Sequence, residues 1–262
     1  MKPVSSLWIG DSLGAYEQLS LASFVSRGYE VRLYTYSDDF APPEGVKLMP
    51  ASEVLPRQRV FANPDRPGTY AAFSNIFRYH LLNSVETIWI DTDVLCVGEV
   101  PGDAILFGWE DSCFINGAVL GIVPGSNFSL ELIRRAEAIG DSVRGWGALG
   151  PRLLTAVAAD LGIKDSAQPA HVFYPVILHQ IWRLFDPRQR AWVSDVLQDS
   201  ATVHLWNEAL RTAPREIKVG SPAPGSFIAD MFDSIGVEPP PGPEISPAWV
   251  RYHWRWVLRD IP

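Results

Sequence analysis

Ile88-Trp89-Ile90-Asp91-Thr92-Asp93-Val94-Leu95-Cys96-Val97 is an apolar run interrupted by two carboxylates, and it decides how the rest of the chain is interpreted. A run of this length, rich in β-branched residues, is typical of a strand buried on both faces. An ionised aspartate inside such a strand has to be paired or metal-bound. Residues i and i+2 of an extended chain point to the same side, with Cα atoms about 6.6 Å apart. The stretch therefore predicts a divalent cation site at a strand end.

The N-terminal part of the chain alternates strand and helix in the way that builds a parallel sheet. Val4–Ile9 and Tyr29–Tyr36 are predicted as strands, with a helix over Ala15–Val25 between them. This order predicts an α/β fold. Further strands are expected at Val46–Met49, Ile105–Trp109, Ile115–Val123 and Thr202–Trp206, and further helices at Thr69–Leu82, Ser129–Ile139 and Pro151–Leu161. Ligands of open α/β sheets gather at the carboxyl ends of strands, which favours a metal role for Asp91 and Asp93 over a simple aspartate turn.

Three segments lack such a pattern. Pro56–Gly68 is rich in proline, arginine and asparagine, and a loop of this length is either functional or disordered. Ser221–Pro247 is crowded with proline and glycine, so we expect an irregular C-terminal wrap. Trp249–Trp256 alternates aromatic and basic residues. This last stretch could lie on a membrane surface or pack back on the domain, and we favour packing.

Composition limits the class of protein and of partner. The 262 residues are 47% hydrophobic and 20% charged, which suits a globular protein with a large core. The net charge of −8 argues against a nucleic-acid partner and requires any anionic substrate to be bound locally. Cys96 and Cys113 are too few for a disulfide framework, and the sequence shows neither a signal-peptide pattern nor a long apolar span. We therefore expect a cytoplasmic protein. If Trp249–Trp256 does not pack on the domain, we expect it to contact the inner face of a membrane peripherally.

The predicted helix Thr69–Leu82 carries polar residues on one side, just before the Asp-x-Asp stretch. Ser74 and Arg78 lie one turn apart, and Asn75 lies beside them. Apolar residues of the same helix can then face the core.

Five blocks in order resemble the signatures of the sugar-binding Asp-x-Asp glycosyltransferases. The blocks are Phe73-Ser74-Asn75-Ile76-Phe77-Arg78-Tyr79, Ile88-Trp89-Ile90-Asp91-Thr92-Asp93, Asn116-Gly117-Ala118, Gly150-Pro151-Arg152-Leu153-Leu154-Thr155 and Val203-His204-Leu205-Trp206-Asn207. That family includes α-1,4-galactosyltransferases and initiating α-1,6-mannosyltransferases. It is more distantly similar to clostridial glucosylating toxins. Leu7-Trp8-Ile9-Gly10 of this chain also resembles the first strand of those toxins.

The resemblance implies a single GT-A, Rossmann-like domain over residues 1–262, with a mixed, mainly parallel central sheet. It divides the chain into a donor-nucleotide half over about 1–97, an acceptor-side half over about 98–215 and a C-terminal wrap over about 216–262. It further implies transfer of a hexose from a nucleotide-sugar donor to a saccharide or glycolipid hydroxyl, with retention of configuration. UDP-sugars are the favoured donors, and a front-face substitution is the favoured mechanism, in which the leaving phosphate helps to take the acceptor proton.

The resemblance also implies roles for individual residues. Asp91, Asp93 and His204 are expected to bind Mn²⁺ or Mg²⁺, and neutral imidazole with carboxylates suits a Mn²⁺-like ion. Asn116 is expected near the transferred sugar. The residues expected to contact the donor are Leu7, Trp8, Ser74, Asn75, Arg78, Trp206 and Asn207, and those expected to bind the acceptor are Glu110 and Asp111.

Each role has a structural alternative. Trp8 could be a core residue, Arg78 a simple ion-pair arginine, His204 a structural histidine, and Glu110 and Asp111 solvated loop acids. Asn75 stands where the family block usually has aspartate, and the Gly-Gly that commonly precedes the metal strand is absent. A strand followed by Asp-x-Asp also resembles the start of haloacid-dehalogenase-like phosphatases, so a metal-dependent phosphohydrolase remains an alternative function. A catalytically dead nucleotide-sugar or glycan-binding protein is another, for which Asn75 is the hint.

Overall fold

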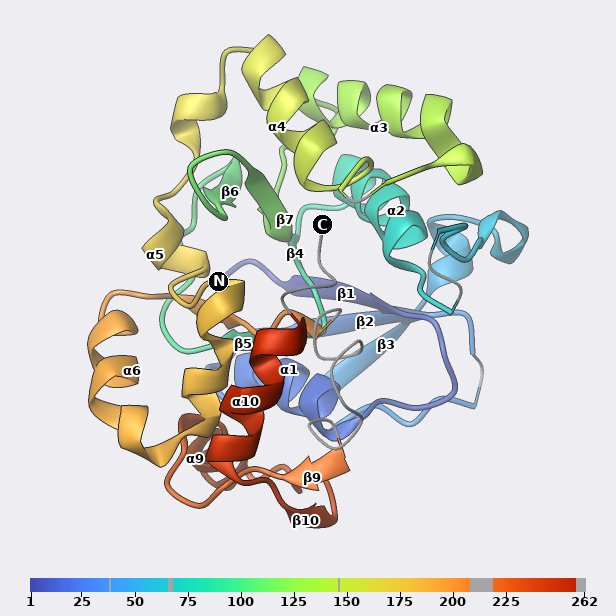
Figure 1. The fold of residues 1–262 in the computed structure, drawn as a ribbon. Coiled ribbons are helices and arrows are strands. Elements are labelled where there is room, and N and C mark those ends of the chain that lie inside the picture. Colours follow the sequence, from blue (N-terminus) through green and yellow to red (C-terminus); the bar gives the residue numbers. More distant parts are fainter. Residues whose placement is uncertain (38, 66–67, 146, 208–218, 258–262) are drawn as a thin grey trace. The chain divides into compact units, whose positions relative to one another are not determined.

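The computed structural model describes residues 1–37, 39–65, 68–145, 147–207 and 219–257, and the side chains of these residues up to 254 (Figure 1). The chain divides into two compact units, each assembled from separate segments. The first contains Met1–Ser12, Gly28–Thr92 and Pro101–Ala170, and the second contains Leu13–Arg27, Asp93–Val100 and His171–Pro262. The chain thus passes from the first unit to the second between Thr92 and Asp93. The predicted single domain with its three parts stays a prediction.

The first unit is built on a six-stranded sheet. Its strand order is β3 (Val46–Pro50), β2 (Val31–Thr35), β1 (Val4–Trp8), β4 (Ile88–Ile90), β7 (Ile115–Gly121) and β6 (Leu106–Trp109). The first four strands run parallel, whereas β7 pairs antiparallel with both β4 and β6. This arrangement confirms the predicted α/β class with a mixed, mainly parallel central sheet.

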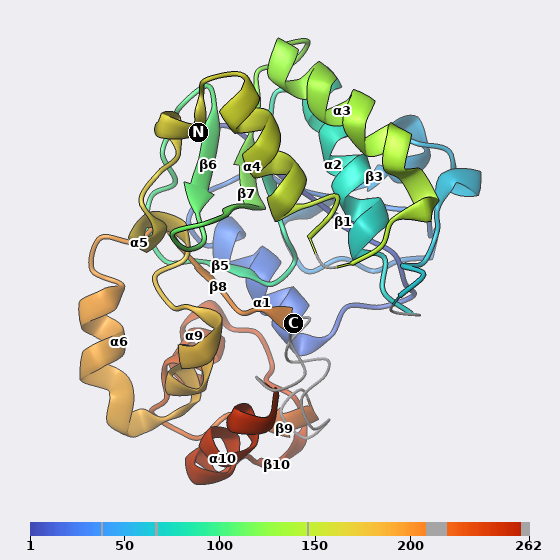
Figure 2. The ribbon, with the colours of Figure 1, turned by 45° about the horizontal axis from the view of Figure 1, so that its top comes forward.

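Helices α2 (Ala71–Ser84), α3 (Asn127–Ile139) and α4 (Pro151–Asp160) complete the core of the first unit and pack side by side (Figure 2). The side chain of Ser126 caps α3, and Pro151 begins α4 at a position where proline costs no hydrogen bond. Phe77 of α2 is fully buried against the rings of Tyr34 and Trp89. Short 3-10 helices lie at Ala51–Glu53, Arg57–Arg59, Gly140–Ser142 and Lys164–Ser166.

The second unit combines helices with two small sheets. Strand β5 (Val94–Cys96) pairs antiparallel with β8 (Thr202–His204), and β9 (Gly220–Ser221) pairs parallel with β10 (Gly242–Glu244). The helices are α1 (Ala15–Val25), α6 (Arg190–Val196), α9 (Phe227–Ile235) and α10 (Pro247–Val257), with short helices α5 (Ala170–Phe173), η5 (Leu178–Phe185) and η6 (Pro187–Gln189). Tyr16 of α1 packs its ring against Phe185 and Phe232 in the core of this unit.

Two predictions about secondary structure were wrong. The run Ile88–Val97 is not one strand, because β4 and β5 pair in different sheets and Asp91, Thr92 and Asp93 lie between them outside any strand. The strand alternation that placed both aspartates on one side therefore does not apply. The predicted irregular wrap contains helix α9, which has a Ser226 cap at its start and Gly236 with φ of 80° after its end.

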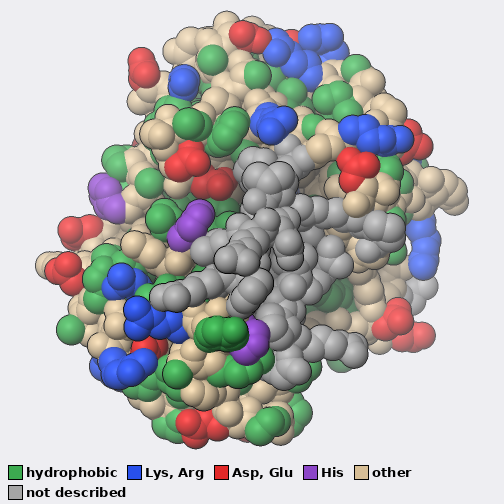
Figure 3. Space-filling model, viewed as in Figure 1, with side chains coloured by type: hydrophobic (Ala, Val, Ile, Leu, Met, Phe, Trp, Pro, Cys, Tyr) green, Lys and Arg blue, Asp and Glu red, His purple; other side chains and the backbone are tan. Residues whose placement is uncertain are grey.

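The part of the aromatic and basic stretch whose side chains are described, Trp249–Trp254, packs back on its own unit, as favoured. Val250 and Trp254 of α10 are buried, and Trp254 Nε1 donates to the carbonyl of Leu178 at 2.8 Å. Among the helices that the structure describes, none combines the length and apolarity needed to cross a bilayer. On the face drawn in Figure 3, acidic and basic side chains are interspersed among the described residues.

Replacing Phe77 with alanine should lower the free energy of unfolding by about 3–5 kcal/mol, because the fully buried ring leaves a cavity against Tyr34 and Trp89. Urea unfolding followed by fluorescence measures the change. Leu130→Ala is the matched control, since this side chain of α3 is 50% exposed and its loss should cost well under about 1 kcal/mol. Equal losses in the two variants would contradict the assigned core.

Candidate active site

Asp91, at the end of β4, is held within the first unit by a buried arginine. Its backbone N–H donates to Ala118 O at 2.8 Å, and its Oδ1 accepts from Arg78 Nη2 at 2.8 Å and from Trp89 Nε1 at 2.6 Å. The Arg78 guanidinium also lies 4.8 Å from the centroid of the Trp89 ring. The opposite charge of the partly exposed Asp91 and these directed hydrogen bonds therefore compensate the burial of the Arg78 guanidinium.

Gly117 makes room for this ion pair. Arg78 Nη1 donates to Gly117 O at 2.5 Å, and a Cβ built on Gly117 would lie 3.0 Å from the same nitrogen. Gly117, the middle residue of the Asn116-Gly117-Ala118 block, therefore contacts Arg78. Arg78 forms an ion pair with Asp91, which is the structural role that the sequence analysis gave as the alternative to donor binding. Contact of Arg78 with the donor stays a prediction.

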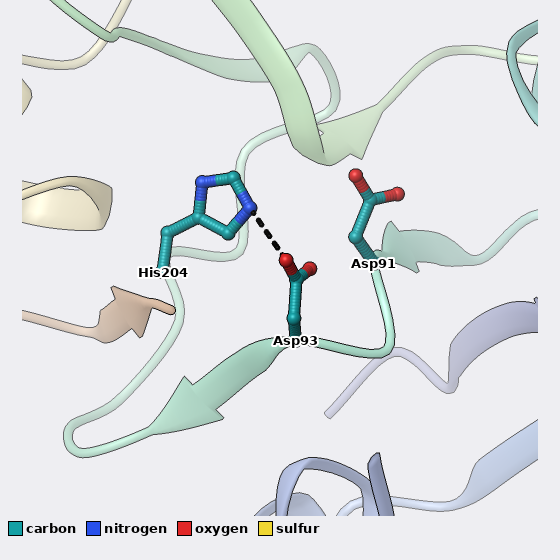
Figure 4. Close-up of side chains that lie close together, drawn as sticks. All are labelled: Asp91, Asp93 and His204. Atoms are coloured by element: carbon teal, nitrogen blue, oxygen red, sulfur yellow. Dashed lines mark ion pairs between the residues drawn. The ribbon is translucent and has the colours of Figure 1, made fainter. Parts of the chain in front are cut away.

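Asp93, two residues later, belongs to the second unit and is held there by the segment that follows β8. Its carbonyl accepts from Leu205 N at 2.8 Å, and its Oδ2 accepts from the backbone N–H of Asn207 at 2.7 Å. His204 Nε2 lies 3.2 Å from the same carboxylate oxygen, an ion pair drawn in Figure 4. Strand pairing of Val94 with His204 sets this geometry. The structure therefore brings together Asp93, His204 and Asn207, all of which the sequence singled out.

The chain turns sharply after His204. Trp206 has φ of 54°, a left-handed conformation that costs a bulky residue free energy and is kept only where surrounding contacts enforce it. Its ring lies 4.3 Å from the His204 ring between centroids, and its Nε1 donates to Val176 O at 3.1 Å. Tyr174 contacts both rings. This aromatic packing restricts the orientation of the His204 imidazole.

Glu17, a residue that the sequence analysis did not single out, belongs to the same group. It lies in the first turn of α1 and is 6% exposed, and its Oε1 accepts from Asn207 Nδ2 at 2.6 Å. Burial, followed by the negative charge of Glu17, raises the pKa of the neighbouring Tyr16 hydroxyl. The sequence signal was an acidic residue in the first turn of a helix that is otherwise mostly apolar and small. Such a residue is ordinarily explained by the helix dipole.

The predicted acceptor residues have defined partners in the first unit. Glu110 Oε2 accepts from Asn116 Nδ2 at 2.8 Å, and Asn116 Oδ1 accepts from Ala118 N at 2.7 Å. Asp111 Oδ1 accepts from the backbone N–H groups of Cys113 at 2.7 Å and Phe114 at 2.9 Å, which is a turn made by an aspartate side chain. Asp111 therefore stabilises its loop, whereas Glu110 orients Asn116.

A cavity of about 180 Å³ lies at the carboxyl ends of β1 and β2, and it begins at the residue after the predicted donor residues Leu7 and Trp8, neither of which lines it. Its lining consists of Ile9, Gly10, Asp11, Thr35, Tyr36, Ser37, Asp39 and Arg57. Leu7 is buried in the core, and Trp8, which is partly exposed, donates from Nε1 to Ser12 O at 3.0 Å. In α2, Asn75 donates to Ala71 O at 2.9 Å, and Ser74 precedes it. Polar groups around a cavity at strand ends suit a small ligand.

Part of the chain matches a family of known glycosyltransferases. Residues 142–229 match the family described as the alpha 1,4-glycosyltransferase conserved region, a span that contains His204, Trp206 and Asn207. No curated protein matches the chain. Among solved structures, one described as "PaToxG Glycosyltransferase" is similar at 13% sequence identity and a TM-score of 0.46, covering 62% of this chain and 68% of that chain.

Gly117→Ala should destabilise the protein by about 1–3 kcal/mol, because the added Cβ forces Arg78 away from Asp91. Neither Gly117 nor the control position Gly102 has a positive φ, and a Cβ on Gly102 would meet nothing within 4 Å. Thermal unfolding of the two variants measures the difference. A Gly117→Ala protein as stable as Gly102→Ala would mean that Arg78 is not held tightly.

Proposed function

We propose that this chain is a retaining glycosyltransferase that moves a hexose from a nucleotide-sugar, preferably a UDP-sugar, to a hydroxyl of a glycan or glycolipid. The match of residues 142–229 to the alpha 1,4-glycosyltransferase conserved region supports glycosyl transfer. The observation that carries the proposal is the Asp93–His204 pair. One partner comes from the Asp-x-Asp stretch and the other from inside the matched region.

Asp91, Asp93 and His204 are the proposed ligands of a divalent cation, each offering one ligand atom. Because only Thr92 separates the two aspartates, their Cα atoms can lie at most about 7 Å apart. Two carboxylates and one imidazole suit Mn²⁺, and Mg²⁺ is the second choice because it prefers oxygen ligands. Such a cation would neutralise negative charge on the donor diphosphate as the sugar leaves.

The protein's own residues would hold these ligands and the donor in place. Arg78 and Trp89 orient the Asp91 carboxylate, and the Asn207 N–H orients that of Asp93. Arg78 would add positive charge at this end of β4. We further propose that the cavity at the ends of β1 and β2 takes the nucleoside of the donor, with Trp8 stacking on the base. Ser74, Asn75 and Asn116 would contact sugar hydroxyls, and Trp206 and Asn207 would flank the diphosphate.

For retention we propose a front-face substitution. The bond between the anomeric carbon and the phosphate oxygen breaks while the acceptor oxygen bonds to the same face of that carbon, and the acceptor proton passes to the leaving phosphate. We favour this mechanism because none of the sequence blocks supplies an obvious enzymic nucleophile, and the two acids expected at the acceptor have partners of their own. Asp111 is engaged by two backbone N–H groups, and Glu110 is engaged by Asn116. Exclusion of water would favour transfer over donor hydrolysis.

The decisive experiment incubates the protein with Mn²⁺ and a panel of UDP- and GDP-linked hexoses, and measures release of free sugar and nucleoside diphosphate. Slow metal-dependent release from one donor is the expected result. Release of phosphate from simple monoesters would instead indicate a phosphohydrolase. Saturable nucleotide-sugar binding without turnover would indicate a binding protein.

Asp93→Asn should abolish metal-dependent turnover while circular dichroism and thermal unfolding stay close to those of the wild type. The amide keeps the size of the side chain but removes the negative charge that a cation requires. Unchanged activity in this variant would refute the proposed ligand.

His204→Ala should raise the Mn²⁺ concentration needed for half-maximal activity by about tenfold or more, because one ligand is lost. His80→Ala is the control, since His80 Nε2 pairs with Glu137 Oε1 at 2.7 Å on helices α2 and α3. A Mn²⁺ titration of both variants checks the prediction. The same metal requirement in both would return His204 to a structural role.

A further inference from the structure

Helix α1 carries buried polar side chains at every third position, and they face the strand that begins beside Asp93. Ser20 Oγ donates to Val94 O at 2.6 Å, and Ser23 Oγ accepts from Cys96 N at 2.8 Å. In the described part of the chain, β5 pairs with β8 alone, so one of its edges lacks a neighbouring strand. The two serines supply the hydrogen bonds that such a strand would make. Helix α1 therefore fixes β5 along its length.

Glu17 continues this row by one turn and reaches the segment after β8. Its Oε1 accepts from Asn207 Nδ2 at 2.6 Å, while the backbone N–H of Asn207 donates to Asp93 Oδ2 at 2.7 Å. A carboxylate can only accept, so it selects the Asn207 rotamer that presents the Nδ2 amide to it. The Glu17 contact thus helps to fix the position of Asn207, whose backbone N–H binds Asp93.

The backbone at this point needs such support. Trp206, immediately before Asn207, has φ of 54°, and a strained conformation persists only when surrounding contacts hold it. The Trp206 ring is held by Val176, and Asn207 by Glu17. Loss of the Glu17 contact would leave one fewer constraint on the turn that aims the Asn207 N–H at Asp93.

Gly14 provides the space that Glu17 occupies. A Cβ built on Gly14 would lie 2.5 Å from Glu17 Oε2. Gly14 has φ of −74° and ψ of 171°, which alanine adopts without strain. The glycine is therefore required by the position of the Glu17 carboxylate and not by the backbone. A Gly14→Ala change would displace Glu17 while keeping its charge.

We infer that Glu17 is a positioning residue, which acts through Asn207 to hold the Asp93 carboxylate in the geometry that binds the cation. The cation itself rests on the proposed function. The hydrogen bonds from Glu17 to Asn207 and from Asn207 to Asp93 lie within the second unit and stand independently of it.

Hydrogen exchange of the metal-free protein tests the positioning directly. Glu17→Ala should speed exchange in residues 202–207, because the turn loses its anchor, whereas Glu17→Gln keeps an acceptor oxygen and should restore protection. Gly14→Ala should resemble Glu17→Ala. Gln18→Ala is the matched control, since Gln18 lies next to Glu17 and donates to Leu13 O at 3.2 Å. Unchanged exchange in Glu17→Ala would overturn the inference, whatever the protein does with metal.

Binding of Mn²⁺ alone, measured by calorimetry, tests the consequence. Glu17→Ala should weaken binding about tenfold and Glu17→Gln by less than about twofold, as expected for a residue that orients a ligand. In an Asn207→Ala background, Glu17→Ala should add no further loss, because the two residues act in series. Additive losses would overturn the inference in favour of a general structural role. If the variants show the expected exchange pattern but the wild-type protein binds no Mn²⁺, the positioning is supported and the proposed metal is refuted.

Discussion

The pairing of β5 with β8 is the constraint on which the candidate site depends. It sets His204 opposite Val94, so the imidazole lies beside the Asp93 carboxylate although more than a hundred residues separate them in the sequence. Two three-residue strands make a weak sheet by themselves. Helix α1 supports it with Ser20 and Ser23, and the buried core around Leu95 and Val203 packs against it. The position of His204 is therefore set by the β5–β8 sheet, which helix α1 stabilises.

The two aspartates have different surroundings because the chain leaves the central sheet between them. Asp91 ends β4 and is balanced by Arg78, a full positive charge at 2.8 Å. Asp93 precedes β5 and is held by a backbone N–H and an imidazole. The orientation of the Asp93 carboxylate therefore depends on the turn after β8, whereas that of Asp91 depends on Arg78 and Trp89.

Local sequence signals explain which elements could be predicted. The bounds of α1 agree with the prediction from Ala15 to Val25, because the apolar pattern ends at a charged residue and a glycine. The helix at Phe227–Ile235 was missed, since the neighbouring prolines and glycines outweighed its Ser226 cap. The run Ile88–Val97 was assigned to one strand because apolarity reports burial and not the identity of the pairing partner. Strand pairing is a long-range property.

The sequence by itself determined the α/β class and the chemical types of the candidate ligands, because strand and helix periods and carboxylate or imidazole side chains are local properties. It also singled out His204 and Asn207 through their order with the other blocks. Only the tertiary structure decided that Arg78 pairs with Asp91, that Asp111 serves its own turn, and that Glu17 holds Asn207. These contacts join residues from separate elements or depend on loop geometry, and packing alone selects among the partners that each polar group could take.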